Sequence, residues 1–182
     1  MKRLGVGHGI VMHMMSGLLV LSLWGIGMGA SAAGVVTRVL ANGEGIELEI
    51  PTDIGTQKEV IPLFHSGPIR YFSAGVGQVE REATYPPFSL KLVFTAGGKP
   101  FVSGVAVNLR DANGRMVLTV PPEHITGPWL FIDLPDGAYE VTATLGGHRQ
   151  EAKGIKVTRG QVMTRHVRWA EDRSPPLAAQ PE

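Results

Sequence analysis

Short runs in which apolar and polar residues alternate dominate the chain after residue 44. The clearest run is Phe88–Thr95, in which Phe88, Leu90, Leu92 and Phe94 share one predicted face. A period of two is typical of strands with one buried face. No window keeps a helical period, and Gly, Pro, Asn and Asp recur at spacings of roughly 8–12 residues. The pattern therefore predicts an all-β sandwich or barrel.

Ten strands follow from these runs and the turns between them. They are predicted at Gly45–Ile50, Glu59–Phe64, Ile69–Ser73, Phe88–Thr95, Val102–Arg110, Arg115–Val120, Trp129–Leu134, Tyr139–Leu145, Gln150–Thr158 and Val162–Trp169. The Asn-Gly pair in 111–114 is a strong hairpin signal, and the last two strands are predicted to form a hairpin around Arg159-Gly160. Gly75-Val76-Gly77 predicts a turn or bulge with no helix after it.

Both ends of the chain differ from this pattern. Lys2 and Arg3 precede an apolar stretch over 10–30, and Ala30-Ser31-Ala32 has the small residues of a cleavage site. These features predict a secretory signal over 1–32, cleaved after Ala32, and an exported protein that is periplasmic or secreted. An uncleaved anchor is the alternative, because the stretch is long enough to span a bilayer. We expect residues 33–44 to be a flexible lead-in within an accessory segment, 33–87, and residues 171–182 to be a disordered tail.

Composition narrows the functions that this chain can have. It has no cysteine, which excludes disulfides, a cysteine nucleophile, thiolate metal sites and a lipid-modified N-terminal cysteine. Of 17 basic and 16 acidic residues, two basic ones and no acidic one lie in the predicted signal. Its removal leaves 15 basic against 16 acidic residues, a net charge of −1. A near-neutral chain gives no electrostatic argument for nucleic acid or an anionic membrane surface. We expect membrane contact only through an uncleaved signal.

Three segments in 88–170 carry a family likeness. They are Ser103-Gly104-Val105-Ala106-Val107, Asp111-Ala112-Asn113-Gly114 and Leu134-Pro135-Asp136-Gly137-Ala138-Tyr139-Glu140-Val141. In order and spacing this region resembles the carboxypeptidase regulatory-like domains, which are prealbumin-like and include the B-type repeats of collagen adhesins. The resemblance implies a seven-stranded Greek-key sandwich, here with a few extra N-terminal strands, and an accessory or binding role without a reaction. The chain departs from the family pattern in Pro121–Trp129.

The Leu-Pro-Asp-Gly segment is explained by turn chemistry. Leu134 is predicted to point into the core, and Pro135 suits the second position of a turn. Asp136 and Gly137 then reverse the chain, with Gly137 free to take a positive φ. Tyr139 is expected to cover one end of the sandwich, with its hydroxyl bonded to the backbone. These five residues are therefore predicted to be structural.

Candidate binding residues come from the segment just ahead of this turn. Glu123 and His124 lie on a predicted loop, where binding residues often occur. Trp129 and Phe131 share one face of their strand, opposite Leu130. If that face is exposed, the two rings form a platform for a sugar or a protein; if 45–87 covers it, both are buried.

No catalytic or metal-binding motif is present in the sequence. The histidines outside the signal show no ligand spacing, and no Gly-x-Ser-x-Gly elbow occurs. We therefore expect no cofactor, no metal and no enzyme activity, with a hydrolase as the least favoured alternative. The predicted function is a non-enzymatic exported binding or assembly module of the bacterial envelope, whose partner is an envelope protein or a glycan. A carbohydrate- or peptide-binding module that uses Trp129 and Phe131 is the alternative.

Overall fold

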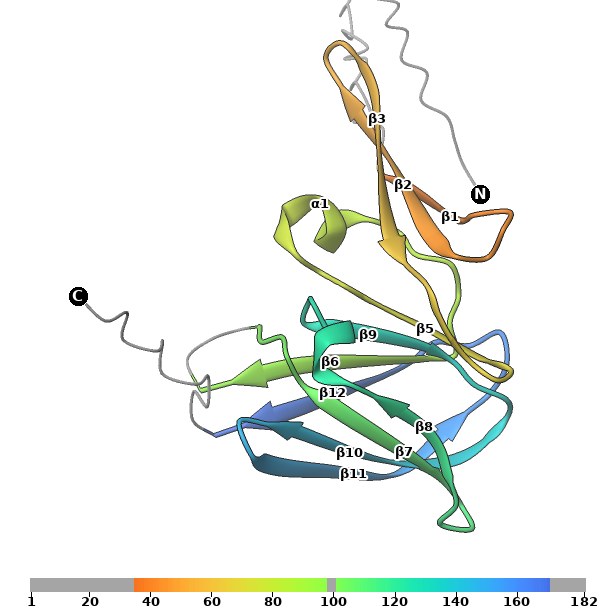
Figure 1. Ribbon diagram of the computed structural model, residues 1–182, viewed down its shortest axis with the longest axis vertical. Coiled ribbons are helices and arrows are strands. Elements are labelled where there is room, and N and C mark those ends of the chain that lie inside the picture. The colour runs from red at the N-terminus through yellow and green to blue at the C-terminus, as the bar shows by residue number, and fades with distance from the viewer. Residues whose placement is uncertain (1–34, 98–100, 171–182) are drawn as a thin grey trace, which may run out of the picture. The chain divides into compact units, whose positions relative to one another are not determined.

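The computed structural model describes residues 35–97 and 101–170. The predicted signal over 1–32 and the predicted tail over 171–182 lie outside these residues. Within them the protein is an all-β structure with one short α-helix and one 3₁₀ turn, which confirms the predicted class (Figure 1). No helix in the described part of the chain is long and apolar enough to cross a membrane.

Two sheets face each other to form a sandwich (Figure 1). The first is antiparallel with the order β11-β10-β7-β8, and the second has the order β12-β6-β9-β5-β4. The strands of the first sheet are β7 (Ala106–Asp111), β8 (Met116–Val120), β10 (Gly137–Leu145) and β11 (His148–Val157). Those of the second are β4 (Phe64–Ser66), β5 (Ile69–Ala74), β6 (Leu90–Ala96), β9 (Trp129–Asp133) and β12 (Met163–Trp169).

The main core lies between these sheets and follows the predicted alternation. Leu90, Leu92 and Phe94 of β6 are fully buried there, and Leu109 of β7 meets them from the opposite sheet. Phe88 does not share this face, contrary to prediction. It precedes β6 and packs in a second core on the other side of the sheet, because the strand alternation begins only at Leu90.

A third sheet supplies most of the second core. Its strands are β1 (Val36–Val39), β2 (Gly45–Thr52) and β3 (Gly55–Pro62), paired antiparallel in that order. Ile46 and Leu48 of β2 pack with Phe72 of β5 and Phe131 of β9. The accessory segment therefore covers the outer face of the five-stranded sheet, and β4 and β5 extend that sheet directly. The other face of the third sheet is charged.

Four side chains cross that charged face. Arg38 pairs with Glu47 and Glu49, and Lys58 pairs with the same two carboxylates. The Lys58 Nζ atom lies 3.2 Å from Glu47 Oε1. The two cations cover Glu47, which explains how a carboxylate can be nearly buried here.

Three predictions about secondary structure are wrong. Val36–Val39 was expected to be flexible but forms β1, because β2 offers it a pairing edge. A helix, α1 (Gly77–Glu82), follows the glycine turn, and Glu80 Oε2 accepts hydrogen bonds from the N–H groups of Gly75 and Val76 at 2.7 and 3.0 Å. Six residues are too few to show a helical period in the sequence.

The third error concerns the last two strands. β11 and β12 do not form a hairpin, because β12 pairs in parallel with β6 of the opposite sheet. This crossing buries Val167 and Trp169 in the main core. The Trp169 indole Nε1–H donates to the carbonyl of His148 at 2.8 Å, which satisfies its polar atom.

Candidate functional site

The predicted aromatic platform is largely covered. Phe131 is 5% exposed, and its ring stacks on Phe72 with centroids 4.7 Å apart and planes at 5°. Trp129 is half-buried, and the Lys91 Nζ atom lies 3.5 Å from its ring centroid. Burial lowers the pKa of Lys91. A ligand cannot stack on Phe131 in this structure, and on Trp129 it would compete with the ammonium of Lys91.

The Glu123-His124 pair lies on a 3₁₀ turn, Pro122–His124. The His124 ring stacks on Phe64 of β4 at 3.8 Å between centroids, with planes at 8°. Its Nδ1 atom is 3.0 Å from the hydroxyl of Tyr71, and burial raises the pKa of that tyrosine. His124 therefore closes an aromatic cluster with Phe64 and Tyr71, whereas Glu123 is exposed.

The other histidines lie apart from this cluster. His65 Nε2 is hydrogen-bonded to the carbonyl of Gly43 at 2.8 Å, while His148 begins β11 and His166 lies within β12. In residues 35–97 and 101–170, no three His, Asp or Glu side chains gather as metal ligands would. The structure therefore does not bring the candidate residues Glu123, His124, Trp129 and Phe131 into one site.

The segment 121–129 is held in place by contacts with a neighbouring strand. The segment before Trp129 packs against β5, the strand added beside β9. The N–H of Gly127 donates to Ser73 Oγ at 2.9 Å, and a Cβ at Gly127 would lie 2.3 Å from the carbonyl oxygen of Ala74. Gly75 also lies against the Trp129 ring, with a φ of 98°. Glycine is required where these two segments meet.

Leu134 and Tyr139 of the Leu-Pro-Asp-Gly corner make the contacts that turn chemistry predicts. Leu134 is buried in the main core, and the Tyr139 hydroxyl donates to the carbonyl of Pro135 at 2.9 Å. Asp136 Oδ1 accepts a hydrogen bond from the N–H of Arg159 at 2.5 Å. One detail is wrong: Gly137 is not among the glycines with positive φ. Gly137 instead lies close to the Tyr139 ring, where a Cβ would make a tight contact at 3.3 Å.

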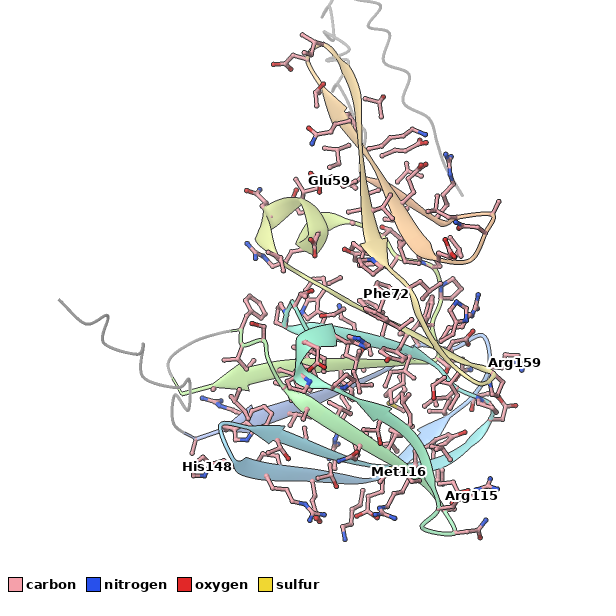
Figure 2. The ribbon with its side chains drawn as sticks, in the orientation of Figure 1. Glu59, Phe72, Arg115, Met116, His148 and Arg159 are labelled. Carbon is pink, nitrogen blue, oxygen red and sulfur yellow. The ribbon has the colours of Figure 1, made fainter. Side chains whose placement is uncertain are left out.

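A groove of about 590 Å³ lies beside this corner. It is bounded by the turn between β7 and β8, by the first residues of β8, by the loop between β4 and β5, and by the corner itself. Figure 2 shows Arg115 and Met116 at the turn between β7 and β8. Apolar walls come from Pro68, Ile69, Met116 and Val117. We call this the corner groove.

Hydrogen bonds fix the polar wall of the corner groove. Asp111 Oδ1 accepts from the N–H groups of Asn113 at 2.9 Å and Arg115 at 3.0 Å, and Oδ2 pairs with the guanidinium of Arg115 at 3.1 Å. Partial burial alone would raise the pKa of Asp111, but these hydrogen bonds and the guanidinium hold it below its usual value. Burial, together with Asp111 and Asp136, raises the pKa of Tyr139. The groove thus has a fixed polar wall, in which Asp111 is paired with Arg115, beside an apolar one.

Sequence reasoning missed this groove although it identified both turns that form it. Residue Tyr139 pairs with Asp111 across β10 and β7. That long-range pairing places the Asn-Gly turn next to the Leu-Pro-Asp-Gly corner. Nothing local in the sequence signals the pairing register.

Comparison with known proteins finds no matching family model, no matching curated protein and no matching solved structure.

Proposed function

We propose that this protein is a non-catalytic, exported β-sandwich of the bacterial envelope that binds an extended segment of a partner protein in the corner groove. The observation that carries the proposal is the position of this groove at an open edge of the sandwich. β8 is the last strand of its sheet and β4 is the last strand of the other. The groove lies between the start of β8 and the loop that follows β4.

An edge strand beside an apolar groove suits an extended peptide. One side of β8 has no neighbouring strand in its sheet, so its backbone groups are available for pairing with an added strand. Met116, the first residue of β8, is 41% exposed and lines the groove. Its side chain offers an apolar contact that adapts to different partners. The burial of Phe131 favours this groove over the aromatic face as the binding surface.

The proposal includes the finer fold that the sequence resemblance implies. β7 and β8 form a hairpin, β9 lies in the opposite sheet, and β10 returns beside β7. This return supports a Greek-key connection and a carboxypeptidase regulatory-like arrangement for residues 88–170. Accessory domains of that kind bind or assemble, which agrees with a partner protein in the groove.

Panning a random peptide library against the full chain tests the proposal. We expect enriched peptides whose binding falls at least about tenfold in Met116→Glu, because a carboxylate there removes an apolar contact beside Asp111. Met163→Glu is the matched control, since Met163 also begins an edge strand and is 40% exposed. Peptides that bind both variants as they bind the wild type would contradict the proposal, and so would a library that yields no binder.

A further inference from the structure

The edge of the sandwich formed by β11 and β12, opposite the edge formed by β8 and β4, is strongly basic. Between His148 and Trp169 the chain has six Lys and Arg residues and one acidic residue, Glu151. The six are Arg149, Lys153, Lys156, Arg159, Arg165 and Arg168. All six are exposed. β11 and β12 are the last strands of their sheets and lie side by side, and we call the edge that carries these six residues the basic edge.

Carboxylates neutralise only part of the basic edge. Lys153 Nζ lies 3.0 Å from Glu140 and 3.5 Å from Glu151, and Arg149 pairs with Glu151 at 2.5 Å. Among residues 35–97 and 101–170, no carboxylate forms an ion pair with the remaining four cations. These are Lys156, Arg159, Arg165 and Arg168.

A groove runs along this edge. It encloses about 240 Å³ between Lys153–Lys156 of β11 and Met163–Arg165 of β12. A β-bulge opens it on the β11 side, where Lys153 and Gly154 together oppose Glu140. Gly154 takes a φ of 67° there, and such a bulge redirects side chains at a sheet edge. The bulge therefore brings Lys156 and Arg165 to a common hollow.

Two exposed apolar side chains lie within the same edge. Val162 and Met163, adjacent in the chain, are 47% and 40% exposed. Arg159 precedes them in the loop between β11 and β12 (Figure 2), and Arg165 follows them. Cationic side chains around a small exposed apolar group match the surface of a lipid bilayer, which has anionic headgroups above an apolar interior. The basic edge exposes no Phe, Tyr or Trp on which nucleic-acid bases could stack; its exposed rings are those of His148 and His166.

We propose that the basic edge docks on a lipid bilayer that displays anionic phosphate headgroups. Lys156 and Arg165 hold a headgroup phosphate in the groove, Arg159 and Arg168 add attraction, and Val162 and Met163 insert between headgroups. The sequence-based expectation was that the near-neutral chain has no such surface. Net charge over the chain misses the basic edge because five of the six acidic side chains in 101–170 belong to other elements, and the pairing of β12 with β6 gathers the cations on one side.

Flotation of the full chain with vesicles tests this inference. Phosphatidylcholine vesicles with and without the anionic lipid phosphatidylglycerol are compared. Binding through the apolar residues 10–30 would be seen with both vesicle types, whereas binding through the basic edge requires the anionic lipid. We expect tighter binding to the anionic vesicles, weakening as ionic strength rises. Lys156→Gln and Arg165→Gln each reduce that affinity about fivefold, the effect of one cation at a charged bilayer surface. Met163→Ser also reduces the affinity for anionic vesicles, because it removes an apolar side chain that inserts between headgroups.

Matched controls distinguish an effect of the basic edge from an effect of net charge and from an effect of the corner groove. Lys58→Gln removes the same charge from the third sheet, and Met116→Ser removes an equally exposed methionine from the corner groove; both leave vesicle binding unchanged. Equal affinity for both vesicle types, no binding, or an equal loss in Lys58→Gln overturns the inference. Two further results would assign the basic edge to another anion and overturn the inference. One is release of the protein from vesicles by inorganic phosphate at matched ionic strength, and the other is tighter binding to a DNA duplex than to anionic vesicles. Because the two proposals use different methionines on opposite edges, failure of one leaves the other standing.

Discussion

Replacement of Phe131 by alanine measures how firmly the third sheet covers the sandwich. Phe131 is 5% exposed, and its ring contacts three others, those of Phe72, Tyr85 and Trp129, at centroid distances of 4.7, 5.0 and 6.4 Å. Truncation of a buried phenylalanine costs about 3–5 kcal/mol in free energy of unfolding. Stacked and edge-on partners add about 0.5–1.5 kcal/mol per pair beyond area burial. We therefore expect a loss of about 4 kcal/mol or more for Phe131→Ala.

Urea unfolding followed by tryptophan fluorescence and circular dichroism gives this free energy directly. For a chain of this size, about 4 kcal/mol corresponds to a fall in Tm of roughly 8–16 °C. Phe131→Leu is the control, because it keeps an apolar side chain while losing the stacking, and it should lose less than Phe131→Ala. A loss below about 1 kcal/mol for Phe131→Ala would refute the reasoning, since it would mean that the face is open to water and that Phe131 is free to act as a platform.

Two further predictions concern buried and turn polar groups. Ser89→Ala should lower the free energy of unfolding by about 1–3 kcal/mol, because Ser89 Oγ accepts a hydrogen bond from the buried N–H of Leu134 at 2.7 Å. Ser89→Thr keeps the hydroxyl and should therefore lose less stability. Equal losses in the two variants would argue against the hydrogen bond. The pKa of Asp111 is lower in the folded protein than in the unfolded chain, so its contribution to stability is present above the unfolded pKa, about 3.9, and is lost as the pH falls through the folded pKa. Acid unfolding of Asp111→Asn should therefore show a smaller fall in stability at low pH than the wild type; an unchanged pH profile would contradict this.

Local chemistry carried the successful predictions. Alternation in 90–94 and 105–109 identified strand faces correctly, because one apolar side chain in two is enough to define a buried face. The Tyr139 hydroxyl and Leu134 lie where turn chemistry places them, since each interaction spans only a few residues. The whole fold class follows from such short-range patterns.

Errors occurred where distant segments decide the outcome. β1 is ordered only because β2 lies beside it, and Phe131 is buried only because residues of β2 and β5 cover it. The face containing Trp129 and Phe131 has the same sequence pattern whether it is covered or exposed. The sequence left both readings open for that reason.

The sequence by itself determined an all-β fold, the faces of most strands and the local contacts of the Leu-Pro-Asp-Gly corner. Only the tertiary structure decided which edges meet. The pairing of β10 with β7 forms the corner groove, and the pairing of β12 with β6 places β12 beside β11 and gathers the basic edge. Strand order depends on contacts between residues far apart in the chain, whereas alternation and turn chemistry depend on near neighbours. Both proposed binding surfaces therefore depend on how the fold brings distant segments together.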